Sequence, residues 1–81
     1  LIDNIFPNPV KTELRVSVKD NINVREIYFN DLSGKIIKPN SINQKNRDYH
    51  INVSNIENGL YILNVIGTDN KFNRVKVIIK R

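Results

Sequence analysis

Apolar residues recur at every second position along much of this chain, and this alternation constrains the fold more than any other feature. Leu14, Val16 and Val18 alternate with polar residues, as in a strand that is buried on one face. Ile27 and Phe29 repeat the pattern farther along. No stretch shows the 3.6-residue period of an amphipathic helix. The chain is therefore predicted to be all-β.

Three further segments are predicted to be strands. Residues 36–37 form a short apolar pair, and residues 49–53 alternate between apolar and polar. Residues 60–66 are apolar except at Asn64, which predicts a central strand buried on both faces. The polar stretch 39–48 has no such pattern, and we expect it to be an exposed loop.

Turn residues separate these segments at intervals of about ten residues, as in small antiparallel sandwiches. We predict one domain, residues 1–81, folded as an antiparallel β-sandwich of about six to eight short strands. A closed barrel would bury the same strand faces and is the alternative. The core is expected to contain Leu14, Val16, Phe29, Ile51, Tyr61, Leu63, Val75 and Val77.

Length and composition limit what such a domain can be. A chain of 81 residues without cysteine depends on its apolar core alone, so we expect modest stability, near the lower end of about 5–15 kcal/mol. No apolar run approaches the roughly 20 residues that span a bilayer, so no membrane-spanning segment is predicted. The chain starts at Leu1 rather than Met, which suggests a domain excised from a longer protein.

The C-terminal segment concentrates the positive charge. Residues 71–81 carry five basic residues and no acid, while the formal net charge of the whole chain is +5. Val75, Val77 and Ile79 alternate here, so the segment is predicted to be a strand with one apolar and one cationic face. The charges either form a recognition signal or keep an edge strand from pairing with other chains.

Few groups are suited to catalysis or metal binding. The one histidine, His50, lies on the polar face of its strand, and Asp48 is the nearest acid in sequence. Asp20, Asp31 and Asp69 lie in turn-like contexts, where a side-chain oxygen usually bonds its own backbone, and they lack calcium-loop spacing. We expect no enzymatic activity, no metal and no cofactor.

Two binding functions are alternatives. Nucleic-acid binding would suit the positive charge, but the aromatic residues do not interleave with the basic ones beyond Phe72, so no nucleic-acid partner is expected. An accessory adhesive or carbohydrate-binding module, appended to a secreted enzyme, would display exposed aromatic residues. The chain has no Trp, and only Tyr28 is clearly predicted on a polar face.

Short motifs separate the predicted strands. Pro7, Asn8 and Pro9 follow an apolar pair and predict a rigid turn, because proline fixes φ and lacks a backbone donor. Residues 31–35 predict a hairpin loop, with Gly34 in the left-handed position that closes it.

A last motif precedes the most apolar strand. Gly59 is expected at a turn or bulge, and Tyr61 in the core with its hydroxyl near the surface. In this order the motifs resemble the type A C-terminal sorting domain of the type IX (Por) secretion system, from Ile5 to Lys80. The candidate sorting-motif residues are Pro7, Asn8, Pro9, Asp31, Gly34, Lys35, Gly59, Tyr61, Lys76, Lys80 and Arg81.

The resemblance implies a fold and a function. Such domains are immunoglobulin-like β-sandwiches that end exported proteins of Bacteroidota and direct their cargo through an outer-membrane translocon. The implied partners are that translocon, a sortase-like surface protease and N-terminal cargo domains of the same chain. The implied location is the periplasm in transit, then the cell surface or the medium. The last strand is expected to be the recognised part, with Lys76, Lys80 and Arg81 solvated.

Overall fold

The computed structural model describes residues 1–19 and 23–81, and within them it has eight strands and no helix. The prediction of an all-β chain is confirmed, whereas the expected turn at Asp20 lies outside the described residues. The strands are β1 (Ile2–Phe6), β2 (Glu13–Val18), β3 (Val24–Asn30), β4 (Ile36–Ile37), β5 (Ser41–Lys45), β6 (Asp48–Asn52), β7 (Gly59–Gly67) and β8 (Phe72–Ile79).

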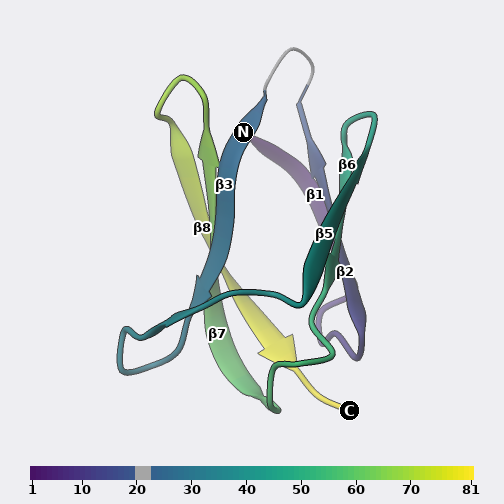
Figure 1. Cartoon of the computed structure of the whole chain (residues 1–81), viewed down its shortest axis with the longest axis vertical. Coiled ribbons are helices and arrows are strands. Elements are labelled where there is room, and N and C mark those ends of the chain that lie inside the picture. The colour runs from purple at the N-terminus through teal and green to yellow at the C-terminus, as the bar shows by residue number, and fades with distance from the viewer. Residues whose placement is uncertain (20–22) are drawn as a thin grey trace.

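The strands form two antiparallel sheets that face each other, in the order β1-β2-β6-β5 and β4-β3-β7-β8 (Figure 1). Two separate sheets confirm the predicted sandwich over the closed barrel. The first, second, fifth and sixth strands share one sheet and the rest share the other, which is the strand distribution of immunoglobulin-like sandwiches. Every pair of neighbouring strands within the two sheets is antiparallel.

The core lies between the sheets and is built from the inward residues of the alternating strands. Phe29 and Tyr61 meet edge to face there, with ring centroids 6.4 Å apart. Val75 is only half-buried, whereas Val77 on the same edge strand is fully buried. The other predicted core residues are all confirmed as buried, namely Leu14, Val16, Phe29, Ile51, Tyr61, Leu63 and Val77.

β7 is central in its sheet, as predicted, but the prediction that both its faces are buried was wrong. Its inward residues, such as Leu63 and Val65, are fully buried, whereas outward Leu60 is 37% exposed. Among the residues that the structure describes, no third layer covers that outer face, so neighbouring side chains of the same sheet shield it. Asn64 is an exception at 5% exposure, and its Nδ2 donates to Asn30 Oδ1 at 2.8 Å.

The predicted loop at residues 39–48 was also wrong, because it contains β5 and the start of β6. A two-residue turn joins these strands, with Asn46 in the left-handed region at φ 57°. All five residues of β5 are exposed, since the strand lies at the edge of its sheet. An exposed edge strand needs no apolar alternation, which is why the sequence pattern missed it.

Candidate functional site

The four motif segments lie at the same end of the sandwich. The β1–β2 connection (residues 7–12), the β3–β4 loop (31–35), the β6–β7 loop (53–58) and the C-terminal residues 80–81 meet at the lower end in Figure 1. We call this the motif end. Segments that are far apart in sequence therefore form one continuous surface.

Asn8 connects the first motif to the last strand. Its Nδ2 donates to the carbonyl of Lys76 at 3.1 Å, and its Oδ1 accepts from the N–H of Ile78 at 2.9 Å. The amide side chain thus occupies the place of a neighbouring backbone along the open edge of β8. Pro7 and Pro9 lie on either side of it, and both are exposed. The predicted end of a strand at these prolines is confirmed, because β1 stops at Phe6.

Val10 continues this contact with its own backbone. Its N–H donates to the Ile78 carbonyl at 2.8 Å, its carbonyl accepts from the Lys80 N–H at 2.9 Å, and it forms a parallel bridge with Ile79. The side chain is fully buried. Val10 belongs to no alternating pattern in the sequence, and its only signal is that it is an apolar residue directly after the second proline.

Arg81 is engaged with the β6–β7 loop rather than simply solvated, which corrects the expectation from sequence. Its Nη2 donates to the carbonyl of Val53 at 2.8 Å and also to the carbonyl of Ile56. Its backbone N–H donates to Asn58 Oδ1 at 3.0 Å. Because these acceptors belong to one loop, Arg81 fixes the C-terminal residues against the motif end.

Tyr61 forms a tyrosine corner at the start of β7. Its hydroxyl donates to the Glu57 carbonyl at 2.7 Å, while the ring is buried, as predicted. Burial, with smaller contributions from the charges of Glu57 and Asp31, raises the pKa of Tyr61 above its usual value.

Gly59 pairs regularly with Ile79, so the expectation that it lies at a turn or bulge was wrong. A Cβ on Gly59 would lie 3.3 Å from the Tyr61 ring, so the glycine leaves room for the corner.

The β3–β4 loop is organised by one carboxylate. Asp31 Oδ1 accepts from the backbone N–H groups of Ser33 and Lys35, both at 2.9 Å, and from the Ser33 hydroxyl at 2.7 Å. The Ser33 hydroxyl first, and then the Lys35 N–H, hold the pKa of Asp31 below its ordinary value. Gly34 has φ +90°, so the left-handed position predicted for it is confirmed.

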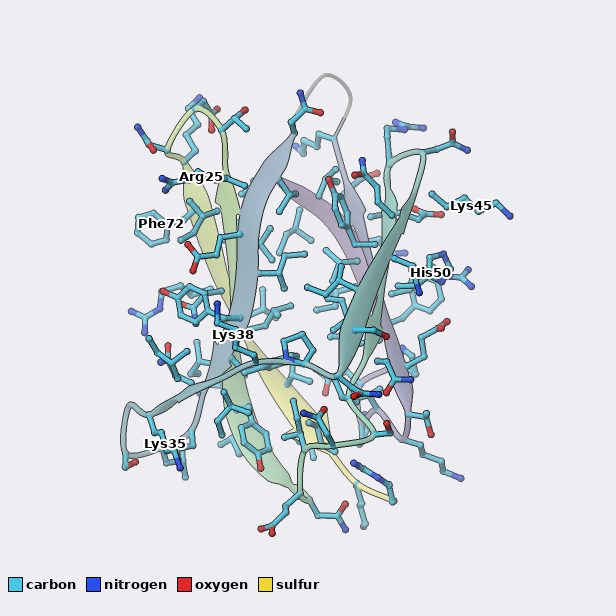
Figure 2. All side chains as sticks on the ribbon, viewed as in Figure 1. Arg25, Lys35, Lys38, Lys45, His50 and Phe72 are labelled. Atoms are coloured by element: carbon cyan, nitrogen blue, oxygen red, sulfur yellow. The ribbon has the colours of Figure 1, made fainter. Side chains whose placement is uncertain are left out.

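A surface depression of about 490 Å³ lies at the motif end, between the β3–β4 and β6–β7 loops. Three of the predicted motif residues contribute to it. The lysines among the candidates, Lys35, Lys76 and Lys80, are all exposed, and Figure 2 shows Lys35 at this end of the molecule. The depression is lined by Asp31, Lys35, Ile36, Ile37, Asn55, Ile56, Glu57 and Tyr61.

Aromatic exposure differs from the sequence prediction, which placed only Tyr28 clearly on a polar face. Phe72 is 63% exposed and projects from the outer face of its sheet (Figure 2). Tyr28 and Phe72 border one shallow depression, together with Asn30, Asn64, Ile66 and Arg74. Phe6, on the other sheet, is 41% exposed. The alternation of apolar and polar residues could not predict this exposure. It indicates on which face of a sheet a residue lies, but not whether other residues cover that face.

The groups considered for catalysis are spread apart. His50 Nδ1 lies 3.1 Å from Glu13 Oε2 on the outer face of the β1-β2-β6-β5 sheet. Asp31 and Asp69 each accept hydrogen bonds from the backbone of their own turn, as predicted. Residues 1–19 and 23–81 contain no group of three or more acidic, His or Cys side chains that could hold a metal ion. The same residues include no helix long and apolar enough to cross a membrane.

Sequence similarity links this chain to a known protein and to a protein family. An ulvan lyase, NLR42 of Nonlabens ulvanivorans, is 30% identical over 76 residues, which cover 93% of this chain but 14% of the lyase. No solved structure matches the chain. The family described as "Secretion system C-terminal sorting domain" matches residues 4–80. The chain therefore belongs to the C-terminal sorting domains of type IX secretion, which accompany proteins exported through the outer membrane to the cell surface or the extracellular space.

Proposed function

We propose that this domain is a non-catalytic sorting signal that directs the protein fused ahead of it through the type IX outer-membrane translocon. The observation that carries the proposal is the convergence of the motif segments around the end of β8. Family membership supports the general role, and the convergence supports a single recognised surface. Removal of the domain by a sortase-like surface protease, after export, belongs to the same proposal.

Within this surface, two groups of residues have different tasks. Lys35, Lys76 and Lys80 are exposed, and we assign them to contact with the export machinery. Arg81 is engaged by carbonyl oxygens of the β6–β7 loop and acts as a positioning residue. The residues that give the motif end its shape are Pro7, Asn8, Pro9, Asp31, Gly34, Gly59 and Tyr61.

The competing explanation is that the charges of β8 only protect a sheet edge. Asn8 and Val10 already pair with the C-terminal half of that edge through four hydrogen bonds to β8 and Lys80. A covered edge has little need of charged residues to keep other strands away. This favours a recognition role for Lys76 and Lys80.

The test is an export assay. Residues 1–81 are fused to a fluorescent protein that carries a Sec signal, in a host with a type IX system. The wild-type fusion should reach the surface or the medium, whereas Lys76→Ala with Lys80→Ala should fold normally and accumulate in the periplasm. Lys19→Ala with Lys45→Ala removes the same charge from exposed positions at the ends of β2 and β5, which lie away from the motif end in Figure 1, and should leave export unchanged.

Arg81 needs a separate variant, because its loss would also free the β6–β7 loop. Arg81→Lys keeps the charge but removes the forked guanidinium contact, so a loss of export in this variant would indicate shape rather than charge. If the wild-type fusion stays in the periplasm, and deletion of residues 71–81 changes nothing, the proposed function is wrong. If both lysine pairs affect export equally, the assignment of the recognised surface is wrong.

A further inference from the structure

The sandwich has four edge strands, and three of them are protected from pairing with another chain. β4 has only two residues. β1 has an irregular register between Ile2 and Asn4, and the Ile2 N–H donates to Asn73 Oδ1 on β8 at 3.0 Å. β8 is covered by Asn8 and Val10. These are the devices by which β proteins avoid edge-to-edge association.

β5 is the fourth edge, and none of these devices is present on it. It pairs with β6 in a regular register over all five residues, and no other strand of the described chain lies beside it (Figure 1). Every residue of β5 is exposed, and Ile42 is 39% exposed despite facing the core side opposite Ile51. Its one charged residue, Lys45, stands at its end.

The register fixes which backbone groups of β5 point outward. Val53 donates its N–H to Thr12 on the β2 side, so by strand alternation Asn52 and His50 direct their backbone groups to β5. Their partners Ser41 and Asn43, and Lys45 beyond them, therefore complete the ladder with β6. The N–H and carbonyl groups of Ile42 and Gln44 are left directed away from the sheet.

We propose that this edge pairs with β5 of a second copy of the chain, antiparallel, about a two-fold axis at Asn43. In that register Ile42 of each copy faces Gln44 of the other, and each such pair exchanges two backbone hydrogen bonds. Ile42 and Gln44, whose backbone groups point away from the sheet, are therefore the two residues that the two-fold axis brings opposite each other. The result is one continuous sheet across two sandwiches.

The charges of the strand favour a second copy as the occupant. Lys45 faces Ser41 of the partner copy, so the two lysines lie at opposite ends of the interface and do not repel at short range. Each Lys45 also has Asp48 opposite it within its own copy. The interface is self-complementary, as a closed two-fold pair requires. Its small area implies a weak dimer, with a dissociation constant on the order of 0.1–1 mM.

Sedimentation equilibrium and amide NMR spectra of the 81-residue chain, recorded from roughly 20 μM to about 2 mM, test the proposal. The mass should rise from 9.4 kDa toward twice that value. The concentration-dependent shifts should be centred on the Ile42 and Gln44 amides. A chain that stays monomeric over this range, or that forms species larger than a dimer, overturns the proposal.

Residue 43 supplies a charge-swap control, because it faces its own copy across the axis. Asn43→Lys and Asn43→Glu should each weaken self-association by up to roughly fivefold, and an equimolar mixture of the two should restore it. Thr68→Lys adds the same charge in the β7–β8 turn and should leave association unchanged. A dimer that is insensitive to Asn43→Lys, or a mixture that fails to associate, would place the contact elsewhere. If the chain stays monomeric but binds an extended peptide of another protein along β5, then that peptide, and not a second copy, occupies this edge, and the proposal is wrong.

Discussion

Asp31 illustrates how a motif residue can act within its own loop. The Ser33 hydroxyl contributes most to the lowered pKa of Asp31, whereas Lys35 contributes mainly through its backbone N–H. Ser33→Ala should therefore raise the pKa of Asp31 toward its ordinary value. Lys35→Ala keeps the backbone donor and should change the pKa less. An NMR titration of the Asp31 carboxyl group in the two variants measures the difference, and equal shifts would contradict the ranking.

The same carboxylate makes stability depend on pH in a definite direction. The folded-state pKa of Asp31 lies below the ordinary value of 3.8, so in the window between the two the unfolded chain binds more protons. This contribution to stability is present above that window and is lost as the pH falls through the folded-state pKa. Asp31→Asn should flatten the acid limb of a plot of unfolding free energy against pH. Parallel limbs for the variant and the wild type would show that Asp31 does not contribute.

Single residues also show what sequence patterns can predict. Gly34 was assigned to the left-handed region because glycine tolerates positive φ in a short loop, a purely local property. The role of Gly59 depends instead on the Tyr61 ring above it, and that of Arg81 on carbonyl groups some 25 residues away. The spacing of residues along the sequence predicts neither of these contacts. Sequence could therefore predict the local conformation at Gly34, but not the contacts of Gly59 and Arg81.

At the scale of elements, β8 is held between two different neighbours. β7 pairs with it along its full length, while Asn8 and Val10 pair with the opposite edge. Alternating apolar residues predicted β2, β3, β6 and β8, and a nearly continuous apolar run predicted β7, since each of these strands has a face in the core. β5 gave no such signal, because its pairing comes from the turn at residues 46–47 and from the neighbouring β6.

Asn8→Ala should weaken this second contact. It removes both hydrogen bonds to β8 and should destabilise the domain by about 1–2 kcal/mol. The Ile78 amide should then exchange faster with solvent. Asn8→Asp retains the acceptor for Ile78 but not the donor to Lys76, so its effect should be intermediate at the Ile78 amide. Asn40→Ala, an exposed side chain elsewhere, is the control, and unchanged exchange of Ile78 in Asn8→Ala would contradict the bridging role.

The whole molecule depends on one small core. Leu63 is fully buried at its centre, and Leu63→Ala should cost roughly 2–5 kcal/mol, because it leaves a cavity between the sheets. For a domain whose total stability is about 5 kcal/mol, this is enough to populate the unfolded state. Chemical denaturation followed by far-ultraviolet circular dichroism measures the change.

Leu60→Ala is the matched control for this prediction. Leu60 is the same residue type on the same strand, but it points outward and is 37% exposed. Its truncation should cost clearly less than that of Leu63. Equal losses would mean that the outer face of β7 is covered in solution, which would contradict the arrangement of the sheets.

The parallel bridge between Val10 and Ile79 also determines when the domain can be completed. Any process that delivers the chain with its N-terminus first, such as synthesis on a ribosome or threading through a pore, presents residues 1–70 before β8. Until β8 arrives, Val10 lacks its backbone partners and β7 has an open edge. The contacts of Asn8, Val10 and Arg81 then form in one late step, so their presence reports that β8 has emerged.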